Sequence, residues 1–177
     1  MNIHYRRLTP TDAKEYRQIR LESLKNYPEN FGSTFEDESK KPKLGYEEYI
    51  EQEAADKFII GAFDNDRLIG ICGFFPEQKI KCRHIGMIIQ MYVKEAYNGQ
   101  GIGLALLRKT IEESFKIEGI EQLILGFVAN NISANKIYEN AGFIEYGVHK
   151  KHFKEGTQYS DQRFMVLYKE DYKSTGK

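Results

Sequence analysis

The feature that most constrains the fold is an apolar segment followed at once by three alternating glycines. Residues 85–93 form an apolar run that is too short to cross a membrane and rich in strand-forming residues, which predicts a buried β-strand. The glycines fall within 99–103, and about 14 residues with helical spacing of apolar side chains follow. A second apolar strand at 121–128 and a second helix at 131–140 come next. This order predicts a βαβ unit with parallel strands and a right-handed crossover.

The alternating glycines indicate an anion-binding loop at the start of a helix. Without Cβ atoms the backbone can turn sharply and direct several N–H groups to one point. The helix N-terminus adds unsatisfied donors and a partial positive charge, which suit a phosphate or pyrophosphate. A glycine-rich turn without a ligand is the alternative. The common nucleotide motifs do not fit, because Ile102-Gly103-Leu104 lacks the lysine and hydroxyl of a Walker loop and the small residue of a dinucleotide fingerprint.

Two motifs in this segment together resemble the core of the GNAT superfamily, the acetyl-coenzyme A-dependent N-acyltransferases. The family's first motif, Gln/Arg-x-x-Gly-x-Gly/Ala, is similar to the run from Asn98 to Gly103. Here Asn98 replaces the usual arginine or glutamine, so one pyrophosphate contact is expected to be weaker or to be made by backbone N–H groups instead. The second motif is similar to residues 131–143, and it is carried by Asn131, Ala134, Ile137, Tyr138, Glu139, Gly142 and Phe143.

The chain predicts a single α/β domain over residues 1–169 and a polar C-terminal tail over 170–177. The resemblance implies a mixed, mostly antiparallel sheet of about seven strands, flanked by about four helices, with the parallel fourth and fifth strands splayed apart. Residues 28–44 are expected to form a polar loop. Strands are expected near 3–8, 57–63, 67–75, 85–93, 121–128, 144–153 and 159–169, and helices near 12–26, 45–55, 103–116 and 131–140.

Composition argues against several partners and sites. Basic and acidic residues number 26 each, which gives no support to binding of nucleic acid or of an anionic membrane. The N-terminus lacks the apolar core of a signal peptide, so a cytoplasmic protein is expected. Cys72 and Cys82 are expected to be reduced thiols, with a disulfide across a hairpin near Pro76 as the alternative. No metal site is predicted, and His84 is expected to be a strand residue.

The resemblance implies where the acetyl donor is held. Its pyrophosphate is expected on the glycine loop, and its pantetheine arm along Met91, Tyr92 and Val93 through strand-like hydrogen bonds. A backbone N–H near Met91 is then the expected oxyanion donor. The residues expected to bind the donor are Met91, Tyr92, Val93, Asn98, Gly99, Gln100, Gly101, Ile102, Gly103, Asn131, Ala134 and Tyr138.

Tyr138 is the expected catalytic acid. Asn131, Ala134 and Tyr138 stand at positions i, i+3 and i+7, so they project from one face of their helix. By resemblance, the Tyr138 phenol would protonate the departing thiolate. On spacing alone the alternative stays open that Asn131 only caps the helix and Tyr138 only packs in the core.

The acceptor site is expected to be built by the loop at 28–44 and the terminal hairpin. Phe31, Phe35 and Tyr159 could wall a slot, with Glu36 or Asp161 attracting a cationic amine. Gln90 stands where relatives often carry a glutamate, and an amide cannot accept a proton. Water held by Gln90 or by backbone carbonyls remains possible as the base, as do Glu36, Glu38 and Asp161, and no base is assigned.

These expectations define an N-acetyltransferase in which a primary amine attacks acetyl-coenzyme A directly within a ternary complex. The acceptor is expected to be a small amine, a polyamine, an amino acid or an antibiotic. A protein N-terminal acetyltransferase, such as one acting on ribosomal proteins, is one alternative. A non-catalytic acyl-coenzyme A sensor and an interaction domain without the ligand are others. An exposed strand of the terminal hairpin could pair across a homodimer.

Overall fold

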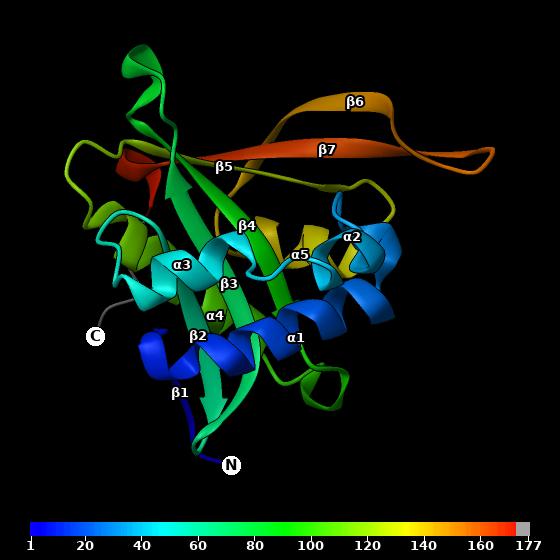
Figure 1. Ribbon diagram of the computed structural model, residues 1–177. Helices are drawn as coiled ribbons and strands as arrows, with labels where there is room; N and C mark the ends of the chain where they lie inside the picture. The colour runs from blue at the N-terminus through cyan, green and yellow to red at the C-terminus, as the bar shows by residue number, and fades with distance from the viewer. Residues whose placement is uncertain (173–177) are drawn as a thin grey trace.

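The computed structural model describes residues 1–172, which form one seven-stranded mixed sheet covered by helices on both faces (Figure 1). The strand order is β1-β2-β3-β4-β5-β7-β6, and β4 and β5 are the parallel pair. This confirms the predicted fold class. The strands are β1 (Ile3–Arg7), β2 (Phe58–Asp64), β3 (Arg67–Pro76), β4 (Ile85–Val93), β5 (Gln122–Val128), β6 (Ile144–Glu155) and β7 (Gln158–Tyr168).

Five α-helices are present among the described residues, one more than predicted. Helices α1 and α3 lie on one face of the sheet, and α4 lies on the other (Figure 1). None of the helices in residues 1–172 has the length and apolar character needed to cross a membrane. The helices are α1 (Ala13–Asn26), α2 (Phe35–Ser39), α3 (Gly45–Glu51), α4 (Ile102–Phe115) and α5 (Ile132–Asn140), with 3-10 turns η1 (Pro10–Asp12), η2 (Pro28–Asn30), η3 (Ile80–Cys82), η4 (Glu95–Tyr97) and η5 (Lys169–Asp171).

The polar segment at 28–44 is not a plain loop, which corrects the prediction. It contains η2 and the short helix α2, which begins where the Thr34 hydroxyl accepts a hydrogen bond from the N–H of Asp37 at 3.1 Å. Helix α3 ends at Glu51, four residues short of its predicted end, because Glu53 takes a left-handed φ of 50° that a helix cannot continue through.

Strands β3 and β4 form the hairpin predicted near Pro76, since they pair antiparallel up to Pro76 opposite Gly86. The connection between them is a longer segment that includes η3. Cys82 lies in η3 and Cys72 is buried in β3, and both are free thiols. His84 precedes β4 in a turn, where its carbonyl accepts the N–H groups of Glu121 and Gln122. Of the predicted C-terminal tail, η5 is described and residues 173–177 lie outside the described part.

The sheet separates two apolar cores. The larger core joins the sheet to α4 and α5, and residues such as Leu107, Ile111 and Leu123 are fully buried there. The smaller core joins the opposite face to α1 and α3 through Tyr16, Ile19 and Ile71 among others. Strands β2, β3 and β4 all contribute side chains to both cores, and β4 is the one of the three that borders β5.

Two irregularities in β4 open the sheet next to it. The parallel pairing with β5 covers only Ile85–Met87 opposite Gln122–Ile124, after which the two strands diverge (Figure 1). Further along, the register with β3 shifts between Ile89 and Tyr92, and Gln90 takes a φ of 53°. This is a β-bulge, because three steps along β4 match two steps along β3. The predicted splaying of the fourth and fifth strands is confirmed.

The close packing at the start of β4 predicts a large cost for a methyl group at Gly86. A Cβ built there would lie 2.3 Å from Phe74 Cε2 and 2.8 Å from Leu123 Cδ2, both in the larger core. We expect Gly86→Ala to lower the free energy of unfolding by about 1–3 kcal/mol, as overpacking of a core does. Urea denaturation measures this.

Gly147→Ala is the matched control, because a Cβ at Gly147 in β6 would meet no atom within 4 Å. Its free energy of unfolding should lie within about 0.5 kcal/mol of that of the parent. Equal stabilities for the two variants would contradict the packing described for β4.

Candidate active site

A cleft of about 570 Å³ occupies the gap where β4 and β5 separate. Its floor is β4 from Ile88 to Val93, one wall is the glycine loop with the start of α4, and the other is β5 with α5. Tyr27, Asn30 and Phe31 from the end of α1 and the η2 turn close one end. The cleft thus joins segments that are distant in sequence around β4.

The bulge decides which β4 side chains face which side of the sheet. Ile88, Met91 and Val93 pack toward α4 and α5, whereas Ile89 and Tyr92 pack toward α1. Gln90 also turns toward α1, because its amide oxygen accepts a hydrogen bond from the Tyr16 hydroxyl at 2.9 Å. Two consecutive residues therefore face α1, which an unbulged strand with strict alternation would not allow.

The glycine loop presents free backbone donors to the cleft. Gly99 and Gly101 have φ of 75° and 77°, and a Cβ at either would meet no atom within 4 Å. The N–H groups of residues 99–101 donate to no acceptor within residues 1–172, and those of the first turn of α4 have no partner inside the helix. The loop has the shape and the donors that a pyrophosphate requires.

Gly103 has a different role from the two glycines before it. A Cβ there would lie 3.2 Å from Ile137 Cδ1 and 3.4 Å from Met91 Cε. Its small size lets α4 approach both α5 and β4. Ile102 beside it is buried in the larger core.

The two polar residues of the predicted motif separate in the structure. Asn98 lines the cleft, and its N–H donates to the carbonyl of Glu95 at 3.0 Å. Gln100 does not line the cleft. It is exposed, and its amide nitrogen donates to the carbonyl of Ala96 at 3.3 Å.

Tyr138 projects from α5 into the cleft and into the larger core together. Its side chain is 7% exposed, and its ring centre lies 5.2 Å from that of Phe127 and 6.2 Å from that of Phe143. The hydroxyl forms no hydrogen bond within residues 1–172, so it is free to donate to a ligand. Burial raises the pKa of the Tyr138 phenol above its ordinary value, and the nearby Cys72 adds to this. The phenol therefore holds its proton firmly.

Asn131 acts as the helix cap that its position predicts. Its side-chain oxygen accepts the N–H of Ala134 at 3.0 Å, and its side-chain nitrogen donates to Asn30 Oδ1 at 3.0 Å. The second bond ties α5 to η2, 101 residues away in sequence. Asn131, Ala134 and Tyr138 all line the cleft, on the side where the donor is expected.

Some of the predicted acceptor residues line the cleft and others lie away from it. Phe31 and Gln90 line the cleft, but Phe35, Glu36 and Tyr159 do not. Phe35 lies 6.0 Å from the Lys25 ammonium and Glu36 is exposed on α2. Tyr159 is 51% exposed near the tip of the terminal hairpin.

Two of the three carboxylates left open as bases have other partners, and the third, Glu36, does not line the cleft. Asp161 forms an ion pair with Lys150 at 2.9 Å, and this bond lowers the pKa of the Asp161 carboxyl. Glu38 binds Lys41 at 2.7 Å.

Tyr27 and Asn30 line the cleft although the sequence did not predict it, because only the path of the chain after α1 brings them there.

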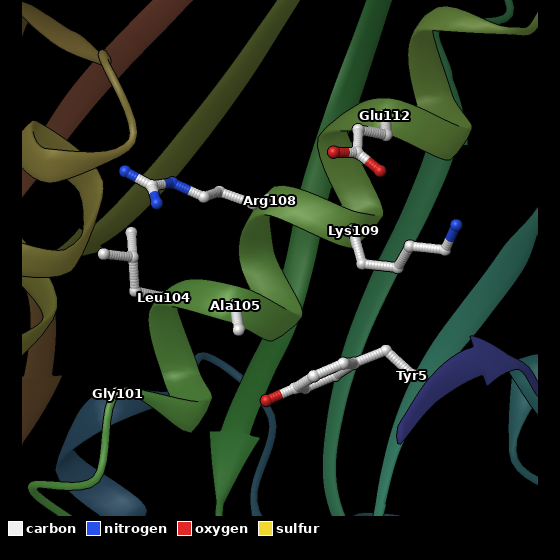
Figure 2. Close-up of a pocket in the computed structure, with 7 residues that line it drawn as sticks. All are labelled: Tyr5, Gly101, Leu104, Ala105, Arg108, Lys109 and Glu112. Atoms are coloured by element: carbon white, nitrogen blue, oxygen red, sulfur yellow. The ribbon is translucent and has the colours of Figure 1, made fainter. Parts of the chain in front are cut away.

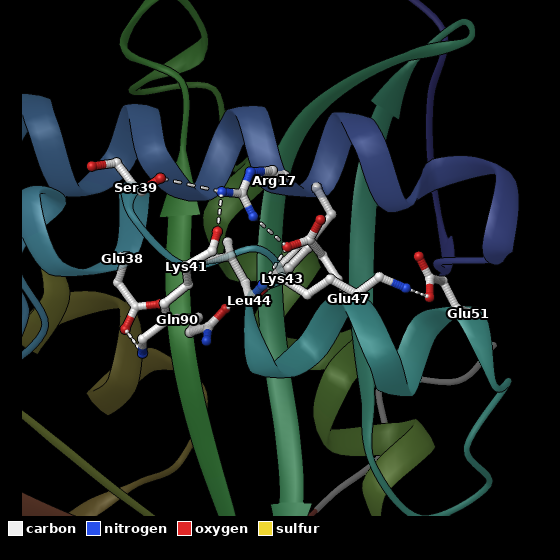
Figure 3. A network of polar contacts seen from close by, with 10 residues as sticks. Arg17, Glu38, Ser39, Lys41, Lys43, Leu44, Glu47, Glu51 and Gln90 are labelled. Carbon is white, nitrogen blue, oxygen red and sulfur yellow. Dashed lines mark hydrogen bonds and ion pairs between the residues drawn. The ribbon is translucent and has the colours of Figure 1, made fainter.

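A polar network fixes the segment between α2 and α3 against α1 (Figure 3). Arg17 donates to Glu47 at 2.8 Å and to the carbonyl of Lys41 at 2.7 Å. Glu47 in turn accepts the N–H of Leu44. The network therefore anchors the segment between α2 and α3 to α1 (Figure 3).

A shallower hollow of about 340 Å³ lies on the outer side of α4 (Figure 2). Gly101 and Leu104 line both this hollow and the cleft. Its cationic side chains already have partners: Arg108 donates to the carbonyl of Asn140 at 3.3 Å, and Lys109 pairs with Glu113 at 3.0 Å. The free donors of the glycine loop therefore define the cleft as the stronger candidate site.

Comparisons with known proteins agree with this geometry. The chain is 25% identical over 175 residues to a probable N-acetyltransferase, YjcK, of Bacillus subtilis, covering 96% of this chain and 95% of that protein. It is 23% identical over 127 residues to a spermidine N(1)-acetyltransferase of Vibrio cholerae, covering 72% and 71%. The structure of yncA, a putative acetyltransferase from Salmonella typhimurium with its cofactor acetyl-CoA, is similar with a TM-score of 0.78 at 17% identity, covering 95% and 94%.

The model of the Acetyltransferase (GNAT) family matches residues 17–143, a range that contains every residue lining the cleft. The chain belongs to the GNAT family of acetyltransferases, and it is an N-acetyltransferase.

Proposed function

We propose that this protein transfers the acetyl group of acetyl-coenzyme A to the primary amine of a small molecule, by direct attack within a ternary complex. The observation that carries the proposal is that one cleft contains three features together. They are an open glycine loop with free N–H groups, an unpaired strand edge and a buried phenol with no partner. Acyl transfer from a thioester needs these elements to hold the donor, stabilise the oxyanion and protonate the leaving sulfur.

The donor would be held largely by backbone. Its pyrophosphate would accept hydrogen bonds from the N–H groups of residues 99–104, where the helix N-terminus also favours negative charge. Asn98 would add a side-chain amide at the rim of the cleft. The pantetheine arm would take the place of a strand beside residues 88–93, whose β5 side has lost its pairing.

The reacting carbonyl would lie at the bulge. A backbone N–H near Met91, beyond the last pair of β4 with β5, would stabilise the oxygen of the tetrahedral intermediate. The amine nitrogen forms the new C–N bond to the carbonyl carbon. When the C–S bond breaks, the sulfur takes the proton of Tyr138, and the phenolate regains a proton from water.

The proton released by the amine passes to water in this scheme. The amide of Gln90 cannot accept it, and its oxygen already receives the Tyr16 hydroxyl. The acceptor would enter from the α1 side, between Phe31 and Tyr92. The Tyr92 hydroxyl donates to Glu22 at 2.9 Å, and Glu22 is paired with Lys94 at 3.3 Å, so this wall is fixed by polar contacts.

We expect Gly101→Val to abolish binding of acetyl-coenzyme A, because a β-branched residue opposes the φ of 77° and its side chain would occupy the cradle. Isothermal titration calorimetry measures the affinity, and circular dichroism checks the fold.

The matched control is Gly119→Val. Gly119 has a φ of 82° and equally open surroundings, and it lies in the turn before β5, outside the cleft. It should show a similar loss of stability with unchanged affinity. Unchanged affinity in Gly101→Val would refute the loop as the phosphate site.

Tyr138→Phe should lower kcat by about 10²–10⁴-fold, which is the usual contribution of a general acid. The ring and its packing remain, and the donor is held elsewhere, so the KM for acetyl-coenzyme A should change little. Initial rates of thiol release with a good amine acceptor measure this.

Tyr172→Phe is the control for loss of a buried phenol oxygen. The Tyr172 hydroxyl is buried without a partner against Phe115, away from the cleft. It should keep the parental rate. A Tyr138→Phe variant as fast as the parent would make Tyr138 a packing residue.

The pH dependence should follow from the raised pKa of Tyr138. An acid whose pKa lies above its ordinary value of 10.0 stays protonated, and therefore active, throughout the neutral and mildly alkaline range. As the pH rises from about 7 to 9.5, kcat/KM should increase while the amine loses its proton, without a falling limb. A falling limb near pH 8 that disappears in Tyr138→Phe would show a lowered pKa instead.

A further inference from the structure

We propose that Arg20 selects acceptors that carry a carboxylate in addition to the amine, so that the acceptor is amino-acid-like. This rests on the proposed function. Arg20 lies on the inner face of α1 and is only 6% exposed. It forms no ion pair within residues 1–172. Its one polar side-chain contact is a long one, with Nη1 3.5 Å from Ser23 Oγ.

Arg17 on the same helix is an arginine whose guanidinium has an ion-pair partner and hydrogen-bond acceptors. Its guanidinium pairs with Glu47 and donates to two backbone carbonyls, of Ser39 and Lys41 (Figure 3). Arg20 is far more buried and has none of these partners. A buried charge without an ion-pair partner is costly, so a ligand that supplied the opposite charge would be stabilised there.

Arg20 lies beside the acceptor end of the cleft. Its guanidinium carbon is 4.7 Å from the centre of the Phe31 ring, and Phe31 lines the cleft. Tyr16, one turn earlier on the same helix face, donates to Gln90, which also lines it. The guanidinium therefore stands directly behind the wall that the acceptor would contact.

The carboxylates around Arg20 are already taken. Burial lowers the pKa of the Arg20 guanidinium, and the charge of Glu38 raises it. The Glu38 carboxylate itself binds Lys41 at 2.7 Å. Glu22 is bound to Tyr92 and Lys94. Glu47 is bound to Arg17. The Arg20 guanidinium thus lacks an ion-pair partner within residues 1–172 and could pair with a ligand carboxylate.

A carboxylate is the group that best fits this position. The planar guanidinium offers parallel N–H donors that match two carboxylate oxygens, and such charge-assisted bonds are stronger than neutral ones. A polyamine would bring further positive charge toward a buried cation and would be disfavoured. The acceptor carboxylate would approach the guanidinium edge beside the Phe31 ring, with the amine directed to the bulge at Gln90.

The test compares each of the twenty amino acids with its carboxamide, together with spermidine and phosphoethanolamine, by thiol release with acetyl-coenzyme A. At least one amino acid should exceed its carboxamide by about tenfold or more in kcat/KM, the discrimination expected from a charge-assisted pair. In Arg20→Met, which keeps much of the volume, this preference should disappear. The carboxamide rate should fall much less than the amino acid rate, and the affinity for acetyl-coenzyme A should stay within about twofold.

The matched control is Lys25→Gln, which removes one positive charge from an exposed position on the same helix. It should keep the preference. Arg20→Lys should retain only part of it, because it keeps the charge and loses the planar fork.

Several results would overturn the assignment. Equal rates for acids and carboxamides in the parent would do so, as would a higher rate with spermidine or phosphoethanolamine than with any amino acid. If Arg20→Met lowered kcat/KM equally for an amino acid and for its carboxamide, and also lowered the melting temperature, Arg20 would have a structural role only.

If the proposed function itself is wrong, no thiol will be released with any amine, which distinguishes that outcome from a wrong assignment of Arg20. In that case calorimetric titration of the same amino acid pairs into the coenzyme A-saturated protein decides the role of Arg20. Preferential binding of the acid that is lost in Arg20→Met supports the assignment, and its absence overturns it.

Discussion

The site depends on one interaction that stops early, the parallel pairing between β4 and β5. The two strands share only three residue pairs before they diverge, although β5 remains paired with β7 along its whole length. Unpaired backbone groups in a sheet interior are costly, so the open edge of β4 needs a partner that can supply N–H and C=O groups in strand-like order. A pantetheine arm has amides of this kind. The opening in the sheet is thus both a weakness of the fold and the basis of its proposed chemistry.

The bulge at Gln90 turns this opening into a site with two sides. Because it shifts the alternation of β4, Met91 faces the donor side while Gln90 and Tyr92 face α1. The hydrogen bond between Asn131 and Asn30 ties α5 to η2, and both residues line the cleft. The donor and the acceptor would approach the same strand from opposite faces of the sheet, which suits a direct transfer without a covalent enzyme intermediate.

The sequence predicts well what local patterns control. The start of α4 follows from its glycines, α5 from the Asn131 cap, and the splayed strands from the family resemblance. It does not predict the bulge, since nothing about a glutamine requires a positive φ. Nor does it predict that Phe35 and Tyr159 lie away from the cleft while Tyr27 and Asn30 line it. Those positions depend on how α2 and the terminal hairpin pack against distant elements, which no short-range pattern encodes.

Gln90 and Arg20 together determine the charge that an incoming amine would meet. A glutamate at position 90 would stabilise an ammonium beside it and would have to remove its proton before attack. The neutral amide of Gln90 gives no such stabilisation. The cationic guanidinium behind Phe31 acts in the opposite direction, because a positive charge nearby lowers the pKa of an amine. The amine would therefore lose its proton to water more readily inside the cleft than outside it. An acceptor carboxylate bound to Arg20 would neutralise part of this charge, so the pKa of the amine would be lowered less. The same ion pair would fix the orientation of the amine toward the carbonyl carbon.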